Sequence, residues 1–165
     1  MNRILLAAAV TSPLLTAVPA YADDREQDSG MFIYGGVGSQ DSHSLGYVGA
    51  GYKFNKYVAV YTREQQEDQG SFEGSSSAVG VRGYIPINNN FRIYGDLGWN
   101  MGDLEQPILG AEVLPNAAEY AVGIQADVSE SAFFDAGFRR QRWGADKDYS
   151  FESMNVIQVG VGFSF

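Results

Sequence analysis

The sequence contains no cysteine, so no disulfide and no thiolate metal site can stabilise the fold. It has one histidine, and no apolar run approaches the roughly 20 residues that a membrane-spanning helix needs. Basic residues are scarce, since 11 Lys and Arg stand against 20 Asp and Glu, for a formal net charge of −9. This acidic balance argues against a nucleic-acid partner. The fold must depend on packing and backbone hydrogen bonds, and we expect no cofactor or metal.

The first 22 residues have the features of a secretory signal peptide. Arg3 precedes an apolar stretch over residues 4–10, and the small-x-small triplet Ala20-Tyr21-Ala22 supplies a cleavage site. Pro13 and Pro19 make the segment a poor membrane anchor. We therefore predict export, with cleavage after Ala22.

Beyond the leader, the chain divides into a short polar segment and one long domain. Residues 23–29 are polar without periodicity and are predicted to be a flexible N-terminal segment. From Gly30 to Phe165, segments of roughly ten residues alternate apolar and polar side chains, a period of two that only extended strands use. The predicted strands cover residues 30–39, 44–54, 57–65, 76–86, 91–103, 117–128, 132–143 and 154–165.

The connections between these segments are expected to alternate in length. Asn55-Lys56, residues 88–90 and residues 129–131 have tight-turn chemistry, whereas the intervening links are predicted to be longer, polar and acidic. Short turns at one end and long loops at the other are typical of an up-and-down outer-membrane barrel.

Alternation alone permits either a soluble sandwich or a membrane barrel. Export, strands near the ~9–11 residues that cross a bilayer, and aromatic residues near both strand ends favour the barrel. We therefore predict an all-β, eight-stranded antiparallel up-and-down transmembrane β-barrel, in which the last strand pairs with the first. The lipid-facing row stays open for the strands at 30–39 and 57–65.

The final segment, VIQVGVGFSF, carries the most specific resemblance. Gln158, Gly160, Phe163 and Phe165 match the pattern polar-x-Gly-x-x-aromatic-x-aromatic. The chain thereby resembles the small outer-membrane barrels that include the transmembrane domain of outer-membrane protein A. The resemblance implies a C-terminal signal read by the barrel assembly machinery in a Gram-negative outer membrane. Because no residue follows Phe165, we expect no periplasmic peptidoglycan-binding domain.

The predicted inward rows carry both signs of charge. A lumen of eight strands is only wide enough to be filled by side chains, so we expect a network of ion pairs that plugs the interior. A gated narrow ion path is the alternative. The predicted network contains Arg82, Arg92, Asp96, Glu119, Asp135 and Arg139, and Lys53 and Asp127 belong to the same rows.

Several residues outside the lumen are candidate binding or catalytic residues. Arg140 and Arg142 lie on a predicted outward row near the outer rim, where they can meet lipid phosphates. The sequence LEQPILGAEVLPN places Ile108, Leu109, Val113 and Leu114 among acidic residues, as a packed hairpin extension or as a contact patch.

Catalysis has weaker support in the sequence. His43, Asp68 and Ser71 belong to loops predicted at one end, an arrangement compatible with a lipid A-modifying enzyme, but no recognisable motif surrounds them. The acidic loop residues can bridge divalent ions to lipopolysaccharide or simply be solvated.

We therefore expect no enzyme, but a structural or surface-interaction barrel with a role in adhesion or envelope integrity. Its expected partners are outer-membrane lipid, lipopolysaccharide, the assembly machinery and a host or phage surface. The alternatives are a small porin-like channel and a lipid A-modifying enzyme.

Overall fold

The alternating segments form antiparallel strands in the computed structural model, which describes residues 29–40, 43–69, 72–106, 111–113, 116–143 and 153–165. No helix in these ranges is long and apolar enough to cross a bilayer. The strands are β1 (Gly30–Gln40), β2 (His43–Asn55), β3 (Val58–Gln69), β4 (Phe72–Pro86), β5 (Phe91–Gln106), β6 (Ala111–Val113), β7 (Asn116–Asp127), β8 (Ala132–Trp143) and β9 (Met154–Ser164).

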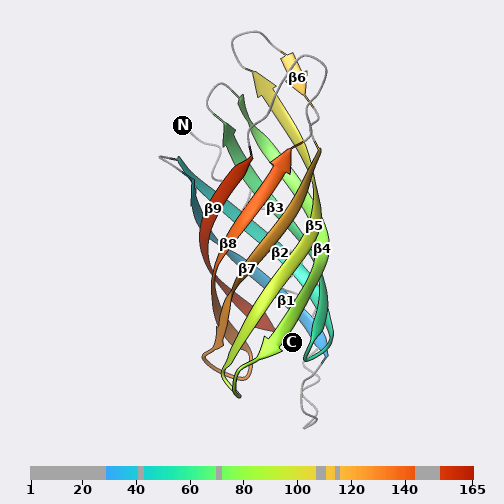
Figure 1. The fold of residues 1–165 in the computed structure, drawn as a ribbon, viewed down its shortest axis with the longest axis vertical. Helices are drawn as coiled ribbons and strands as arrows, with labels where there is room; N and C mark the ends of the chain where they lie inside the picture. Colours follow the sequence, from blue (N-terminus) through green and yellow to red (C-terminus); the bar gives the residue numbers. More distant parts are fainter. Residues whose placement is uncertain (1–28, 41–42, 70–71, 107–110, 114–115, 144–152) are drawn as a thin grey trace.

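The sheet closes into a barrel of eight long strands, which confirms the predicted fold class. Each long strand pairs with the long strands before and after it in the sequence, including β4 with β5. The barrel closes where β9 pairs with β1, from Phe32↔Ser164 to Ser39↔Ile157. Figure 1 shows the strands strongly tilted around the barrel axis. Closure leaves no open sheet edge within the barrel wall, as a bilayer without water requires.

The short strand β6 continues the line of pairing between β5 and β7. Gln106 pairs with Ala111, Leu104 with Val113 and Met101 with Asn116, so the register is unchanged from one ladder to the next. In Figure 1, β5 and β6 rise beyond the other strands at the end opposite the C-terminus. This end of the barrel is called the outer end below, and the end with the tight turns is called the inner end. The connection between β5 and β7 at the outer end is therefore largely a continuation of the hairpin that these two strands form.

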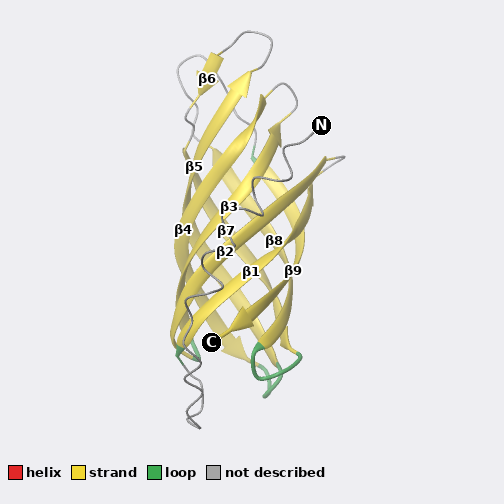
Figure 2. Ribbon diagram, turned by 180° about the vertical axis from the view of Figure 1, so that it is seen from behind, coloured by secondary structure: helices red, strands yellow, loops and turns green. Residues whose placement is uncertain are grey.

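The prediction of longer outer links was wrong for the first two hairpins. Gln40 pairs with His43, and Gln69 pairs with Phe72, so only residues 41–42 and 70–71 separate the paired ends. Residues that were predicted to be loop belong to the strands instead, because polar residues also pair where the neighbouring strand continues in register. The tight turns at the other end are as predicted, and Figure 2 shows them on the side of the C-terminus.

The structure decides the two registers that the sequence left open. Phe32 and Tyr34 of β1 are buried on the lumen side, as are Ala59 and Tyr61 of β3. Val58, Val60 and Thr62 consequently face outward. The choice in β3 places Arg63 in the lumen, away from lipid.

The two rows of each strand differ in exposure as expected for a barrel in lipid. The outward row is apolar and exposed, with Leu97 reaching 72%. Trp99 and Met101 lie outward toward the outer end, and Tyr52 and Phe54 lie outward near a tight turn. Aromatic residues such as Trp99, Tyr52 and Phe54 are typical of the two membrane interfaces of a barrel.

Candidate functional site

The outer part of the lumen is filled by an ion-pair cluster centred on Glu119 of β7. Arg63 of β3 donates from Nη1 to Glu119 Oε1 at 2.9 Å, and its Nη2 pairs with the second carboxylate oxygen. Gln141 Nε2 donates to Glu119 Oε2 at 3.1 Å, and Arg139 Nη1 lies 3.9 Å from the same oxygen. Arg139 of β8 also donates to Gln65 of β3. Since β8 and β3 are four strands apart in either direction, these contacts span the lumen.

A second layer is built around Arg82 of β4. Its Nε and Nη2 donate to the two carboxylate oxygens of Asp96 at 2.7 Å each, a bidentate pair between directly opposed residues of β4 and β5. The guanidinium carbon lies 4.2 Å from the ring centroid of Tyr94, 5.6 Å from that of Tyr34 and 5.7 Å from that of Tyr61. Cation–π contacts with aromatic rings on three strands therefore support the buried cation.

Asp135 of β8 has no ion-pair partner among the described residues. It is buried, and its Oδ2 accepts no hydrogen bond from them. A side chain at Gly160 would bring a Cβ within 2.6 Å of the Tyr47 hydroxyl and 3.2 Å of Asp135 Oδ2. The glycine therefore provides the space that these two polar groups occupy.

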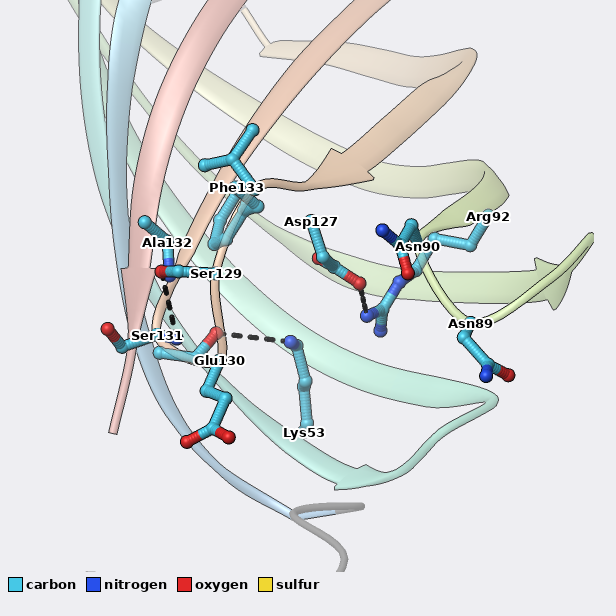
Figure 3. A pocket seen from close by; sticks show the side chains of 12 residues that line it. Lys53, Asn89, Asn90, Arg92, Asp127, Ser129, Glu130, Ser131, Ala132 and Phe133 are labelled. Atoms are coloured by element: carbon cyan, nitrogen blue, oxygen red, sulfur yellow. Dashed lines mark hydrogen bonds and ion pairs between the residues drawn. The ribbon is translucent and has the colours of Figure 1, made fainter.

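The inner mouth of the lumen, at the end with the tight turns, holds a third ion pair, Arg92–Asp127, and the lysine Lys53. Arg92 Nη2 pairs with Asp127 Oδ2, and Gln125 Nε2 donates to Asp127 Oδ1 at 2.9 Å. Nearby, Lys53 Nζ donates to Ser164 Oγ at 3.2 Å. Figure 3 shows Lys53 and the Arg92–Asp127 pair around one pocket.

All six residues of the lumen network expected from the sequence lie on inward rows. Arg82, Asp96, Glu119, Asp135 and Arg139 are buried, and Arg92 is half-buried near the mouth. They do not form one continuous network but separate layers, of which Arg82–Asp96 is one and Arg92–Asp127 is another.

Sequence reasoning missed Arg63 and Gln65, which hold the outer cluster together. Ala59, Tyr61, Arg63 and Gln65 form one buried row of β3. An unbroken alternation to residue 65 was a usable signal, but the even-numbered row starts with Val58 and Val60 and looked equally acceptable. The charges did not decide between the rows, because Arg63 on the odd-numbered row is followed at once by Glu64 on the even-numbered row.

The residues of the C-terminal pattern divide between the two faces of β9. Gln158 is buried in the lumen and donates from Nε2 to the Tyr94 hydroxyl at 3.3 Å, and Gly160 adjoins Tyr47. Phe163 and Phe165 are exposed on the outward row. Their role as an assembly signal remains a prediction.

Of the remaining candidates, the structure describes Arg140 and Arg142 in full. Arg140 and Arg142 are exposed on β8, where Arg140 is opposite Tyr120 of β7 and Asn155 of β9. Residues 108, 109 and 114 of the expected contact patch lie outside the described residues, as does Ser71, and for Val113, His43 and Asp68 only the backbone is described. Within the described residues, no cluster of His, Cys, Asp and Glu could hold a metal.

Solved structures of similar shape include bacterial outer-membrane barrels. The N-terminal barrel domain of Pseudomonas aeruginosa OprF has a TM-score of 0.70 and 17% identity, with 84% of this chain and 98% of that chain covered. Neisserial surface protein A has a TM-score of 0.59 and 14% identity, covering 83% and 96%.

A third similar structure is Ail, the attachment invasion locus protein of Yersinia pestis, in complex with the heparin analogue sucrose octasulfate. Its TM-score is 0.50, with 18% identity and coverage of 83% and 97%. No curated protein matches the sequence. The model of the outer membrane protein beta-barrel domain family, however, matches residues 8–165. This chain therefore belongs to that family of bacterial outer-membrane barrels.

Proposed function

We propose that this protein is a structural barrel of the outer membrane whose hairpins at the outer end form an interaction surface. The observation that carries the proposal is the contrast between a filled lumen and long outer hairpins. Charged and aromatic side chains from opposite walls meet across the axis, so the interior offers stability rather than transport. The surfaces at the two ends of the barrel are therefore the parts that are available for function.

The outer hairpins extend beyond the apolar band. Along the outward row of β4, Val81 and Val79 are followed by Ser77 and Ser75, and Ser77 Oγ donates to Glu64 Oε2 of β3 at 2.7 Å. Polar outward residues on paired strands indicate that the hairpins stand in water above the lipid interface. A rigid sheet that projects from the membrane is a suitable scaffold for recognition.

Two of the similar structures support a surface role by their own descriptions. One is a neisserial surface protein, and the other is an attachment invasion locus protein bound to a sulfated heparin analogue. We extend only the general role, contact with an external surface, to this chain. The expected contact residues are Ile108, Leu109, Val113 and Leu114.

The experiment is to shorten the third outer hairpin. Replacement of residues 102–115 by Asn-Gly would connect Met101 to Asn116, which are already paired. We expect a folded, heat-modifiable barrel that has lost adhesion to host cells or sensitivity to a phage. The finer variant I108S/L109S should have the same effect if the apolar patch is the contact. Unchanged adhesion and phage sensitivity in both variants would contradict the proposal.

A small channel is the second candidate, supported by the pocket at the inner mouth. The layers around Glu119 and Arg82 lie between this pocket and the outer end. We therefore expect purified protein in planar bilayers to give little or no stable conductance. Large, reproducible channels from the monomer would favour the porin-like function instead.

Two further roles of the outer end follow from the sequence. Arg140 and Arg142, exposed on β8, are proposed to contact lipid phosphates. No observation on the described residues favours lipid A modification, and a lipid A mass change that depends on His43 would establish that activity.

A further inference from the structure

A polar pocket of about 330 Å³ lies in the inner mouth of the barrel, among the tight turns. Asn89 and Asn90 come from the turn between β4 and β5, residues 129–131 from the turn between β7 and β8, and Lys53 from β2 (Figure 3). The short turns of bacterial outer-membrane barrels face the periplasm. The pocket is therefore accessible to periplasmic solutes.

Lys53 is the unusual group in this pocket. The residue is only 8% exposed, and it forms no ion pair with any described residue. Nζ lies 5.9 Å from the ring centroid of Phe32 and 5.7 Å from that of Phe133, and its hydrogen-bond acceptor is Ser164 Oγ. An ammonium group has three donors, so Lys53 retains donors for a ligand. Buried charges in proteins are ordinarily paired.

The carboxylates around the pocket do not compensate Lys53. Asp127 is bound by Arg92 and Gln125. Glu130 is exposed on its turn, and Figure 3 shows its carboxylate pointing away from Lys53. The Arg92–Asp127 pair is neutral, so Lys53 is the cation of this lining that pairs with no carboxylate among the described residues.

The walls of the pocket are held in place by local hydrogen bonds. Ser129 Oγ accepts from the backbone N–H of Ala132 at 3.0 Å, and Ser164 N donates to the Ser131 carbonyl at 2.8 Å. On the other side, Asn88 Oδ1 accepts from the N–H groups of Asn90 and Phe91 at 2.9 Å each. A site with fixed walls loses little conformational entropy when a ligand binds.

We infer that the inner mouth binds the carboxylate of a small periplasmic molecule or of a peptide end, with Lys53 as the recognition cation. A single unpaired cation matches a monoanion better than a phosphate, because Arg92 is already paired with Asp127. A lipid headgroup does not fit, since Lys53 lies on the lumen row whereas Tyr52 and Phe54 face outward. A volume of about 330 Å³ is at the lower end of the range for small-ligand pockets and is enough for a small carboxylate or a peptide end.

The test uses the refolded full barrel in micelles, with backbone amide NMR shifts as the readout. Acetate and N-acetyl-Ala-Ala are the carboxylate probes, N-acetyl-Ala-Ala amide is the uncharged control, and inorganic phosphate is the competing anion. We expect saturable shifts at Ser131 and Ser164 with the carboxylates and none with the amide. Tighter binding of N-acetyl-Ala-Ala than of acetate assigns the site to a peptide end, and equal binding assigns it to small carboxylates.

Variants at two neighbouring lysines make the test specific. K53M, whose thioether can pack between Phe32 and Phe133, should weaken carboxylate binding at least tenfold. K53R should retain binding, and K56M is the matched control because Lys56 is exposed on the adjacent turn. The inference fails if K53M binds like wild type, if K56M loses as much affinity, if the amide binds equally, or if phosphate binds best. Heat-modifiability of each variant verifies its fold.

Discussion

The lumen row and the lipid row of the same strands follow opposite rules. On the lumen row, Glu119 is held by Arg63 and Gln141, and its removal would orphan specific partners. On the lipid row, Leu97 is 72% exposed and depends on the surrounding bilayer for its apolar environment. The inner row therefore requires particular residues, whereas the outer row requires only a particular polarity.

The largest effect is expected from E119A, which tests the specificity of the lumen row. Without the Glu119 carboxylate, the charges of Arg63 and Arg139 would stay buried and lose their ion-pair partner. Breaking a buried ion pair in this way lowers the free energy of unfolding by about 3–5 kcal/mol. Urea unfolding of the refolded barrel in lipid vesicles measures the change. The double variant R63A/E119A should lose less than the sum of the two single variants. A change below about 1 kcal/mol for E119A would contradict the account of the lumen.

The second effect tests the polarity rule of the lipid row. Leu97 lies near the middle of the outward row of β5, where L97R should lower the free energy of unfolding by about 2–4 kcal/mol. L97A should change it far less, because lipid fills the space that the side chain leaves. The same unfolding assay compares the two variants. Equal effects of Arg and Ala at this position would mean that Leu97 does not face the bilayer core.

The third prediction separates assembly from stability. Phe165 and Phe91 are both exposed on the outward row at the inner end, where a charge changes stability by only about 0–1 kcal/mol. If the C-terminal pattern is an assembly signal, F165D should strongly reduce the heat-modifiable barrel in cells while F91D does not. Refolding of both purified variants in vitro should succeed. Similar cellular levels of F165D and wild type would refute the signal.

The smallest effect on stability is expected at the outer rim. R140Q/R142Q should change the free energy of unfolding by less than about 0.5 kcal/mol, because both side chains are exposed on β8. We expect at least twofold less lipopolysaccharide to copurify with this variant. E64Q, an exposed charge on the opposite wall, is the control. Equal lipopolysaccharide content in all three proteins would exclude a phosphate contact at these arginines.

Much of the architecture could be predicted because strand pattern is a local property. Alternation at Ile157, Val159 and Val161 identified the outward row of β9, and the apolar-polar rows of β5 and β7 were assigned in the same way. The ends of the outer hairpins were less predictable. Polar sequences such as residues 66–69 read as loop, yet they pair because β4 continues alongside them.

The sequence predicted which charged residues lie in the lumen, but not which of them pair with one another. The sequence placed charges such as Arg82 and Asp96 in the lumen, and their direct opposition in the ladder follows only from the register of β4 and β5. Arg63 was missed because both rows of β3 looked apolar at their start. Lys53 was recognised as inward, but its isolation from carboxylates depends on the positions of Arg92 and Gln125 beside Asp127.

The barrel of alternating strands follows from the sequence alone, because the period of two and the strand lengths depend only on neighbouring residues. Tertiary structure alone decided which charges meet, as when Arg139 of β8 reaches Gln65 of β3 from the opposite wall. The physical reason is that strand tilt and stagger set the height of each inward side chain in the lumen. These quantities belong to the closed sheet, so no single strand encodes them.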